Sequence, residues 1–251
     1  MEIILVPGLW LTGASWDRVV PLLEQAGHRT HPLTLPGMES REANRSTITR
    51  RDHVDAVVAA IDSIDPADGT VVLVGHSAGA AIAHAAVDAR PDRIAHAIYV
   101  GGFPVGDGVA DPGEFPTENG EIPLPDWSGF DDADLVDLDD QLRAEFRRHA
   151  VPSPARAASD PQQLTDKRRY DVPVTVICPE FSSEMLHGWI AQDMAPVREL
   201  AKIREVEYVD LPTGHWPQFT RPAELAQTIL ARVTTAAPSG PVGAGGDPAA
   251  G

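Results

Sequence analysis

The stretch that decides the fold is Val71-Val72-Leu73-Val74-Gly75-His76-Ser77-Ala78-Gly79. Its first four residues are apolar and mostly β-branched, which predicts a strand buried on both faces. A Gly-x-Ser-x-Gly motif follows, and the alanine-rich run 80–87 favours a helix. A strand, a sharp turn and a helix around this motif predict a nucleophile elbow. Such an elbow holds the Ser77 hydroxyl above the sheet at the N-terminus of a helix.

Five further apolar runs predict strands on either side of this elbow. They lie at residues 3–6, 31–35, 94–100, 172–178 and 206–211. Helical patterns separate them: one capped by Ser15 and stopped by Gly27, one over about 49–63, one beginning near Ser183 and one from about 220 to 233. Strands that alternate with helices predict an α/β fold with a mostly parallel sheet of about six strands and helices on both faces.

The interval 103–169 breaks this alternation and predicts an inserted cap over the C-terminal edge of the sheet. Within it, residues 139–149 have a helical pattern, and Phe115, Trp127 and Phe130 indicate an apolar or aromatic pocket. An unstructured acidic loop is the alternative. Residues 1–102 and 170–235 would then form the core, and the tail 236–251, rich in proline, glycine and alanine, is expected to be disordered.

The composition is that of a globular protein with a sizeable core. The chain has 251 residues, 43% of them hydrophobic, and 37 acidic against 20 basic residues give a net charge of −17. This charge argues against nucleic acid and anionic membranes as partners. The single cysteine, Cys178, excludes an intrachain disulfide and a multi-cysteine zinc site. With neither a signal-peptide pattern nor an apolar run of about 20 residues, we expect a cytoplasmic protein of unknown oligomeric state.

Reactive side chains follow the predicted strands at their C-terminal ends, where parallel sheets bind ligands. Gly8, Ser77, the pair Glu180 and Glu184, and His215 each follow a different strand. A serine hydroxyl needs an adjacent base, and that base needs an acid to orient it. Of the nine histidines, His215 follows the last strand, so we expect it to be the base. The sequence contains no cluster with metal-ligand spacing, so we expect neither a metal nor another cofactor.

The chain resembles α/β-hydrolases of the esterase and hydroxynitrile lyase-like group over nearly all of residues 1–235. The motifs that carry the resemblance are Val6-Pro7-Gly8-Leu9-Trp10, Leu35-Pro36-Gly37-Met38, Gly75-His76-Ser77-Ala78-Gly79 and Gly214-His215-Trp216. The resemblance implies Ser77 as nucleophile and His215 as general base, in the chain order of that fold. The oxyanion donors would be the backbone N–H groups of Leu9 and Ala78. The candidates for substrate contact are Gly8, Trp10, His76 and Trp216.

The acid that orients His215 is the part of the site where the chain departs from its family. Members often place an aspartate five residues after the last isoleucine of a strand, and counting from Ile177 leads to Ser182. Glu180 lies two residues before that position and Glu184 two residues after it. We favour Glu180, because a carboxylate at Glu184 fits the N-terminus of the next helix. Asp107 is a remote alternative, and a Ser77–His215 dyad without an acid stays open.

These residues predict a cofactor-free serine hydrolase that acts on an ester, thioester or lactone of a small apolar molecule. The alternative is a protein that has kept the fold to bind such a ligand without turnover. Hydroxynitrile lyase chemistry is not expected, because those relatives carry a threonine where this chain has Gly8 and a lysine where it has Trp216. Dehalogenases and epoxide hydrolases carry an aspartate at the position of Ser77, which disfavours them too.

Overall fold

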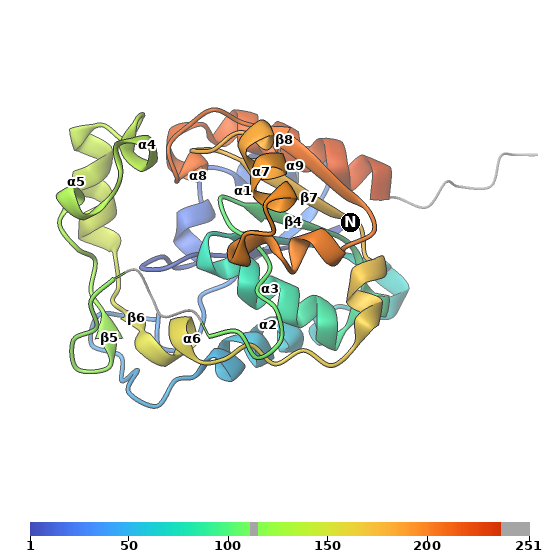
Figure 1. The fold of residues 1–251 in the computed structure, drawn as a ribbon, viewed down its shortest axis with the longest axis horizontal. Helices are drawn as coiled ribbons and strands as arrows, with labels where there is room; N and C mark the ends of the chain where they lie inside the picture. The colour runs from blue at the N-terminus through green and yellow to red at the C-terminus, as the bar shows by residue number, and fades with distance from the viewer. Residues whose placement is uncertain (111–114, 237–251) are drawn as a thin grey trace, which may run out of the picture.

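A computed structural model describes residues 1–110 and 115–236, with side chains described as far as Val233 (Figure 1). Its centre is a six-stranded sheet in the order β2-β1-β3-β4-β7-β8, and every neighbouring pair is parallel. The strands are β1 (Glu2–Val6), β2 (Arg29–Pro32), β3 (Val71–His76), β4 (Ile94–Val100), β7 (Val174–Cys178) and β8 (Val206–Asp210). The predicted fold and strand number are confirmed.

Helices cover both faces of this sheet, as the sequence predicts. The helices are α1 (Val20–Gln25), α2 (Arg50–Ser63), α3 (Ala78–Ala89), α7 (Ser183–Ala191), α8 (Pro217–Thr220) and α9 (Pro222–Ala236). On one face, Ile4 and Leu73 share a buried core with residues of α2, α3 and α7. On the other face, Ile3 and Val72 share a second core with residues of α1 and α9. Neighbouring strand residues thus face opposite layers, which explains why β1 and β3 are buried along their whole length.

Two predicted boundaries are wrong near the N-terminus. The helix expected from Ser15 is instead a 3₁₀ turn, η1 (Gly13–Trp16), which the Thr12 side chain caps, and α1 starts at Val20. Pro21 accounts for the late start, because proline fits the first turn of a helix and not its interior. The strand expected at 31–35 is β2, two residues earlier, and its ladder with β1 ends at Pro32.

The predicted cap, 103–169, contains short elements between β4 and β7. They are β5 (Glu121–Ile122), which pairs antiparallel with β6 (Ser153–Pro154), and the helices α4 (Asp132–Leu135), α5 (Asp140–His149) and α6 (Ala155–Ser159). Figure 1 shows α4, α5 and β5 at one end of the molecule. Helix α5 lies within one residue of the range expected from the sequence. The division of the chain into core and cap stays a prediction, and residues 111–114 lie outside the described residues.

Aromatic side chains join the cap to the sheet. Trp10 and Trp216, which follow β1 and β8, share a third buried cluster with Ile122, Leu135 and Phe146 of the cap. The residues expected to be a disordered tail lie outside the described residues from 237 onward. Among the helices that the structure describes, none is both long and apolar enough to cross a membrane.

Candidate active site

Ser77 occupies the sharp turn between β3 and α3. Its backbone has φ 52° and ψ −127°, a strained conformation for a residue with a side chain. Close packing at the two motif glycines holds this turn. A Cβ atom at Gly75 would lie 2.6 Å from the Gly79 carbonyl oxygen, and one at Gly79 would lie 2.5 Å from the Pro7 carbonyl oxygen. The motif therefore needs glycine at both positions, as the sequence predicts for a nucleophile elbow.

A chain of hydrogen bonds connects Ser77, His215 and Glu180. Nε2 of His215 lies 2.9 Å from Ser77 Oγ, and Nδ1 of His215 lies 2.7 Å from Glu180 Oε1. A carboxylate only accepts hydrogen bonds, so Nδ1 carries the imidazole proton and Nε2 is left to accept the proton of the serine hydroxyl. The three side chains follow β3, β8 and β7, whose C-terminal ends share one edge of the sheet. This arrangement suits nucleophilic attack by Ser77.

Glu180, and not Glu184, lies beside His215. The Glu180 side chain is only 14% exposed, and its second oxygen, Oε2, is buried without a hydrogen-bond partner among the described residues. Glu184 lies exposed in the first turn of α7. Ser182, at the position where the family often has its acid, caps that helix by accepting the Met185 N–H at 3.2 Å. Asp107 lies in the cap, where it accepts the backbone N–H of Leu164.

The two expected oxyanion donors belong to segments that lie against Ser77. A Cβ atom at Gly8 would be 2.9 Å from both Ser77 Cβ and His76 Nδ1, so only glycine lets the loop that carries Leu9 come this close. Ala78 is the first residue of α3, and N–H groups in the first turn of a helix have no partner within it. The role of the Leu9 and Ala78 amides stays a prediction.

His76 supports the histidine loop, and its expected substrate contact stays a prediction. The side chain is fully buried, and its Nε2 lies 2.8 Å from the backbone carbonyl of His215. Because a carbonyl only accepts, Nε2 carries the proton, and Nδ1 is a buried lone pair without a hydrogen-bond partner among the described residues. Burial and the nearby His215 lower the pKa of His76 to about 3, so its ring stays neutral.

Trp10 and Trp216 are buried among the aromatic side chains of the cap. Trp10 packs edge-on against Phe115 and Phe130, and the Trp216 ring lies 5.0 Å from the His215 ring. Trp127 also contacts Phe130 and Trp216. The three aromatics that were expected to line a pocket therefore pack against Trp10, Trp216 and one another. Substrate contact by Trp10 and Trp216 stays a prediction.

Two residues not predicted from the sequence, Asp134 and Asp137, contact the histidine loop from the cap. The backbone carbonyl of Asp134 accepts the N–H of His215 at 2.9 Å, and Asp137 Oδ1 accepts the N–H of Gly214 at 2.9 Å. No local motif marks these two residues among the many acidic side chains of the cap. Only the packing of α4 on the loop after β8 brings them to the site.

Asp134, Glu180 and His215 are also the described residues that could hold a metal ion. One ligand atom from each lies within 4.8 Å of the other two. Both ring nitrogens of His215 are already engaged by Glu180 and Ser77. A metal bound here would have to break that hydrogen-bonded chain, so the geometry suits proton transfer better than metal binding.

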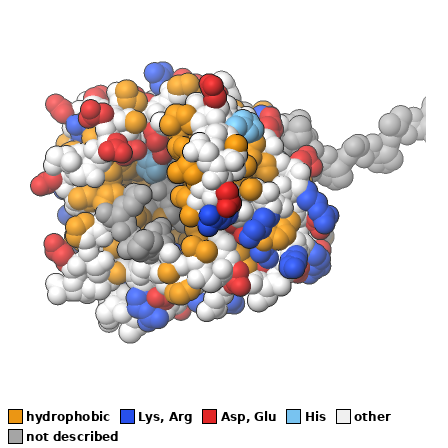
Figure 2. All heavy atoms as spheres, viewed as in Figure 1, with side chains coloured by type: hydrophobic (Ala, Val, Ile, Leu, Met, Phe, Trp, Pro, Cys, Tyr) orange, Lys and Arg blue, Asp and Glu red, His pale blue; other side chains and the backbone are white. Residues whose placement is uncertain are grey.

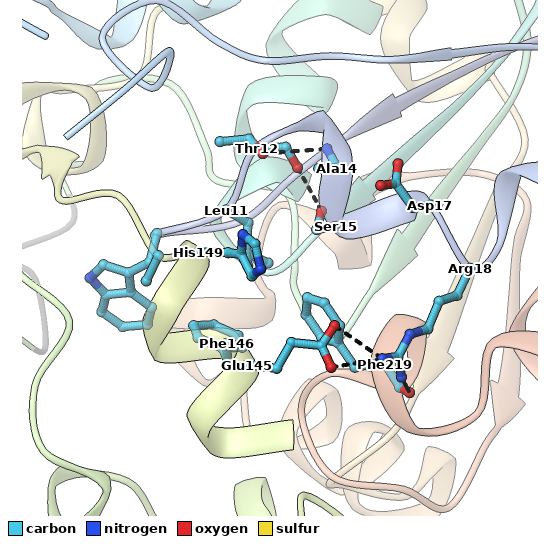
Figure 3. Close-up of a pocket in the computed structure, with 12 residues that line it drawn as sticks. Leu11, Thr12, Ala14, Ser15, Asp17, Arg18, Glu145, Phe146, His149 and Phe219 are labelled. Atoms are coloured by element: carbon cyan, nitrogen blue, oxygen red, sulfur yellow. Dashed lines mark hydrogen bonds and ion pairs between the residues drawn. The ribbon is translucent and has the colours of Figure 1, made fainter. Parts of the chain in front are cut away.

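A separate cavity of about 140 Å³ lies between η1, α5 and α8 (Figure 3). Trp10, Phe146 and Phe219 contribute to its lining, whereas Ser77 and His215 do not. Figure 3 shows Arg18 pointing toward Glu145; its Nη2 donates to both carboxylate oxygens of Glu145, and its Nη1 donates to the Phe219 carbonyl. The cavity therefore lies at the interface between cap and core, and the Arg18–Glu145 ion pair lies at one side of it.

A comparison with protein families identifies the fold independently. The model of the alpha/beta hydrolase family matches residues 3–228. The chain belongs to the α/β-hydrolase family. Its order of Ser77, Glu180 and His215 along the sequence is the order in which members of this family carry nucleophile, acid and histidine.

Curated proteins similar to this α/β-hydrolase are named hydrolases and esterases. A pyrethroid hydrolase of Sphingobium wenxiniae is 35% identical over 99 residues, which are 39% of this chain and 35% of that protein. Methylesterase 8 of Arabidopsis thaliana is 35% identical over 102 residues, 40% of this chain and 37% of that protein. The chain thus matches about a third of the length of these two relatives. Methylesterase 9 of the same plant is 24% identical over 89% of this chain and 93% of its own.

Solved structures resemble the whole fold. An extracellular α/β-hydrolase from a Paenibacillus species has a TM-score of 0.73 at 20% identity and covers 92% of this chain and 98% of its own. A pyrethroid hydrolase has a TM-score of 0.71 at 22% identity and covers 93% of this chain and 97% of its own. Likeness at these identities shows the fold alone.

Proposed function

We propose that this α/β-hydrolase is a serine hydrolase that cleaves an ester of a small, largely apolar molecule. The hydrogen-bonded chain from Glu180 through His215 to Ser77 is the observation that carries the proposal. The names of its relatives, a pyrethroid hydrolase and several methylesterases, support ester hydrolysis. Thioesters and lactones have the same reactive carbonyl and belong to the same proposal. The proposed partner is a small molecule, and a cytoplasmic location remains part of the proposal.

The reaction proceeds through an acyl-enzyme. Ser77 Oγ attacks the ester carbonyl carbon while its proton passes to Nε2 of His215. The carbonyl electron pair moves onto the oxygen, where the N–H groups of Leu9 and Ala78 stabilise the negative charge. The intermediate then expels the alcohol, which takes the proton from His215. Water attacks the acyl-enzyme with His215 again as base, and the carboxylic acid leaves.

Hydroxynitrile lyase chemistry lies outside the proposal because the two groups that it needs are missing. Gly8 offers no hydroxyl to the substrate, and Trp216 offers no positive charge to a departing cyanide. We therefore expect no release of cyanide from mandelonitrile above the uncatalysed rate. Release that depends on the protein and disappears in Ser77→Ala would overturn this exclusion.

A panel of p-nitrophenyl esters with acyl chains of increasing length tests the proposal. We expect turnover by the wild type, a loss of at least ~10⁴-fold in Ser77→Ala, and normal turnover in Ser46→Ala, a matched variant of an exposed serine. Hydrolysis by Ser77→Ala at the wild-type rate would refute the mechanism. Saturable ester binding without turnover by the wild type would instead identify a binding protein and refute the proposed function.

A further inference from the structure

Helix α4 of the cap is attached to the loop that carries His215. Besides the two hydrogen bonds from His215 and Gly214 to Asp134 and Asp137, the backbones are in close contact. A Cβ atom at Gly214 would lie 2.3 Å from the Asp134 carbonyl oxygen. Glycine at this position therefore lets the cap reach the histidine loop. The position of His215 depends on α4 as well as on the sheet.

The same contact brings a second carboxylate to the Glu180–His215 pair. One oxygen of Asp134 lies within 4.8 Å of a Glu180 oxygen and a His215 nitrogen. Asp134 is partly buried, and its other contact is with the Asp131 N–H, which donates to Oδ2 at 3.1 Å. Figure 2 shows acidic side chains concentrated at the cap end of this face, near a hollow in which a histidine is visible.

The charged groups around Asp134 come from three directions. The groups are Glu180 and His215 on the sheet side, Asp131, Asp132 and Asp137 on the segment around α4, and Arg143 on α5. Arg143 is occupied by the carbonyls of Leu138 and Leu135. Burial, together with the negative charge of Glu180, raises the pKa of Asp134, and the nearby His215 opposes that rise. Among these groups, His215 is the one that gains a positive charge during the proposed reaction.

We propose that Asp134 is a positioning residue of the active site, a second carboxylate that the cap supplies to stabilise the protonated form of His215. The inference rests on the proposed function. When Ser77 attacks the substrate, His215 gains a proton and a positive charge, and Glu180 Oε1 lies 2.7 Å from its Nδ1. A second negative charge a few ångströms away favours that imidazolium.

The pH dependence of ester hydrolysis by Asp134→Asn tests this role. Asparagine keeps an oxygen that can accept the Asp131 N–H, and it removes the charge. Because the acid limb of kcat/KM reports protonation of the free base, removing a neighbouring negative charge should move that limb to lower pH by about one unit. The matched control is Asp132→Asn, which removes a charge from the same turn of α4 at an exposed position and should leave the limb unchanged. Circular dichroism checks the fold, and Asp134→Ser is a second neutral variant.

A double-variant cycle separates electrostatic support from a structural role. In the Glu180→Gln background, the carboxylate of Asp134 still lies near His215, so Asp134→Asn should cost about tenfold more there than in the wild type. An unmoved acid limb in both neutral variants, or equal losses in the two backgrounds, would overturn the inference. The proposed function is judged separately, because it fails only if the wild type shows no turnover that depends on Ser77.

Discussion

At the scale of single residues, side-chain length decides which acid serves His215. The family position for the acid is occupied by Ser182, which caps α7. Glu180 lies two residues earlier, and its additional methylene lets the carboxylate reach Nδ1 at 2.7 Å. Ser77 and His215 are predicted from sequence motifs and from their positions after strands. Glu180 is favoured over Glu184 only because a carboxylate at position 184 fits the N-terminus of the next helix. Asp134 cannot be predicted from the sequence, because its contact with the His215 loop depends on how the cap packs against the sheet. The cap has no regular alternation of strands and helices from which this packing could be inferred.

Glu180→Gln and Glu184→Gln should differ strongly in turnover. Glutamine at 180 can present its amide to Nδ1 and so favour the wrong tautomer of His215, which costs up to ~10⁴-fold in kcat in a related triad. Because the Asp134 carboxylate remains near His215 in Glu180→Gln, we expect the loss of kcat to be smaller than this limit. Glu184 is exposed on α7, and its replacement should leave kcat within about twofold. Steady-state hydrolysis of a p-nitrophenyl ester checks both variants, and an inactive Glu184→Gln beside an active Glu180→Gln would contradict the assignment.

Gly8→Ala should impair catalysis through the oxyanion loop. The added Cβ would meet Ser77 Cβ and His76 Nδ1 at 2.9 Å, and His76 is fully buried and cannot move aside. We expect kcat to fall by about 10²–10³-fold, the usual effect of losing one oxyanion donor. Gly129→Ala is the matched control, because its Cβ would make only ordinary contacts in the cap. Normal kcat in Gly8→Ala would show that the Leu9 amide does not hold the oxyanion.

At the scale of helices and strands, the elements that are predicted correctly are those with a clear local sequence pattern. The elbow, β4 and α2 agree with their expected ranges because buried β-branched runs and a Thr49 cap define them. β2 was predicted two residues late because Leu33 and Leu35 resemble a strand, although Leu35 packs into the core below it. Tertiary contacts therefore override the local pattern at the edge of the sheet.

A buried network of charged side chains connects the segment after the cap to α3. Glu199 accepts hydrogen bonds from Arg169 at 3.0 Å and from Lys202 at 2.9 Å, and it lies 3.3 Å from His84 Nε2. Arg169 also contacts Asp88 of α3 at 3.0 Å. Burial opposes the charge on Glu199, but the bonds from His84, Lys202 and Arg169 outweigh it and hold the pKa of Glu199 below its ordinary value.

Glu199→Gln should destabilise the protein by about 3 kcal/mol, because it leaves a buried Arg169 without half of its compensating charge. Asp62→Asn removes one partner of an ion pair whose side chains, Arg90 and Asp62, are 40% and 43% exposed. That variant should cost no more than about 1 kcal/mol. Urea unfolding measures both free energies. Equal losses in the two variants would mean that the buried network contributes no more than a surface ion pair.

At the scale of the whole molecule, acid should destabilise the fold through its buried histidines. Burial lowers the pKa of His76 to about 3 and that of His96 to about 4, from an ordinary value of 6.5. The unfolded chain therefore binds more protons than the folded one in this range, and stability falls as the pH drops below the ordinary value toward the two folded values.

Each of these two histidines should cost about 2 kcal/mol of unfolding free energy between about pH 7 and about pH 5. Urea unfolding at the two pH values measures this loss of unfolding free energy. In His96→Gln the loss should be smaller by the contribution of one histidine, about 2 kcal/mol. Equal free energies of unfolding at the two pH values would contradict the burial of neutral imidazoles.

Every step of the proposed reaction depends on Ser77 being a nucleophile activated by His215. Exposure to a small fluorophosphonate, followed by intact mass measurement and peptide mapping, tests this claim without knowledge of the substrate. We expect one phosphonyl adduct per chain on Ser77, no adduct in Ser77→Ala, and labelling slowed by several orders of magnitude in His215→Ala. An unchanged mass of the wild type, or an adduct on another residue that persists in Ser77→Ala, would contradict it.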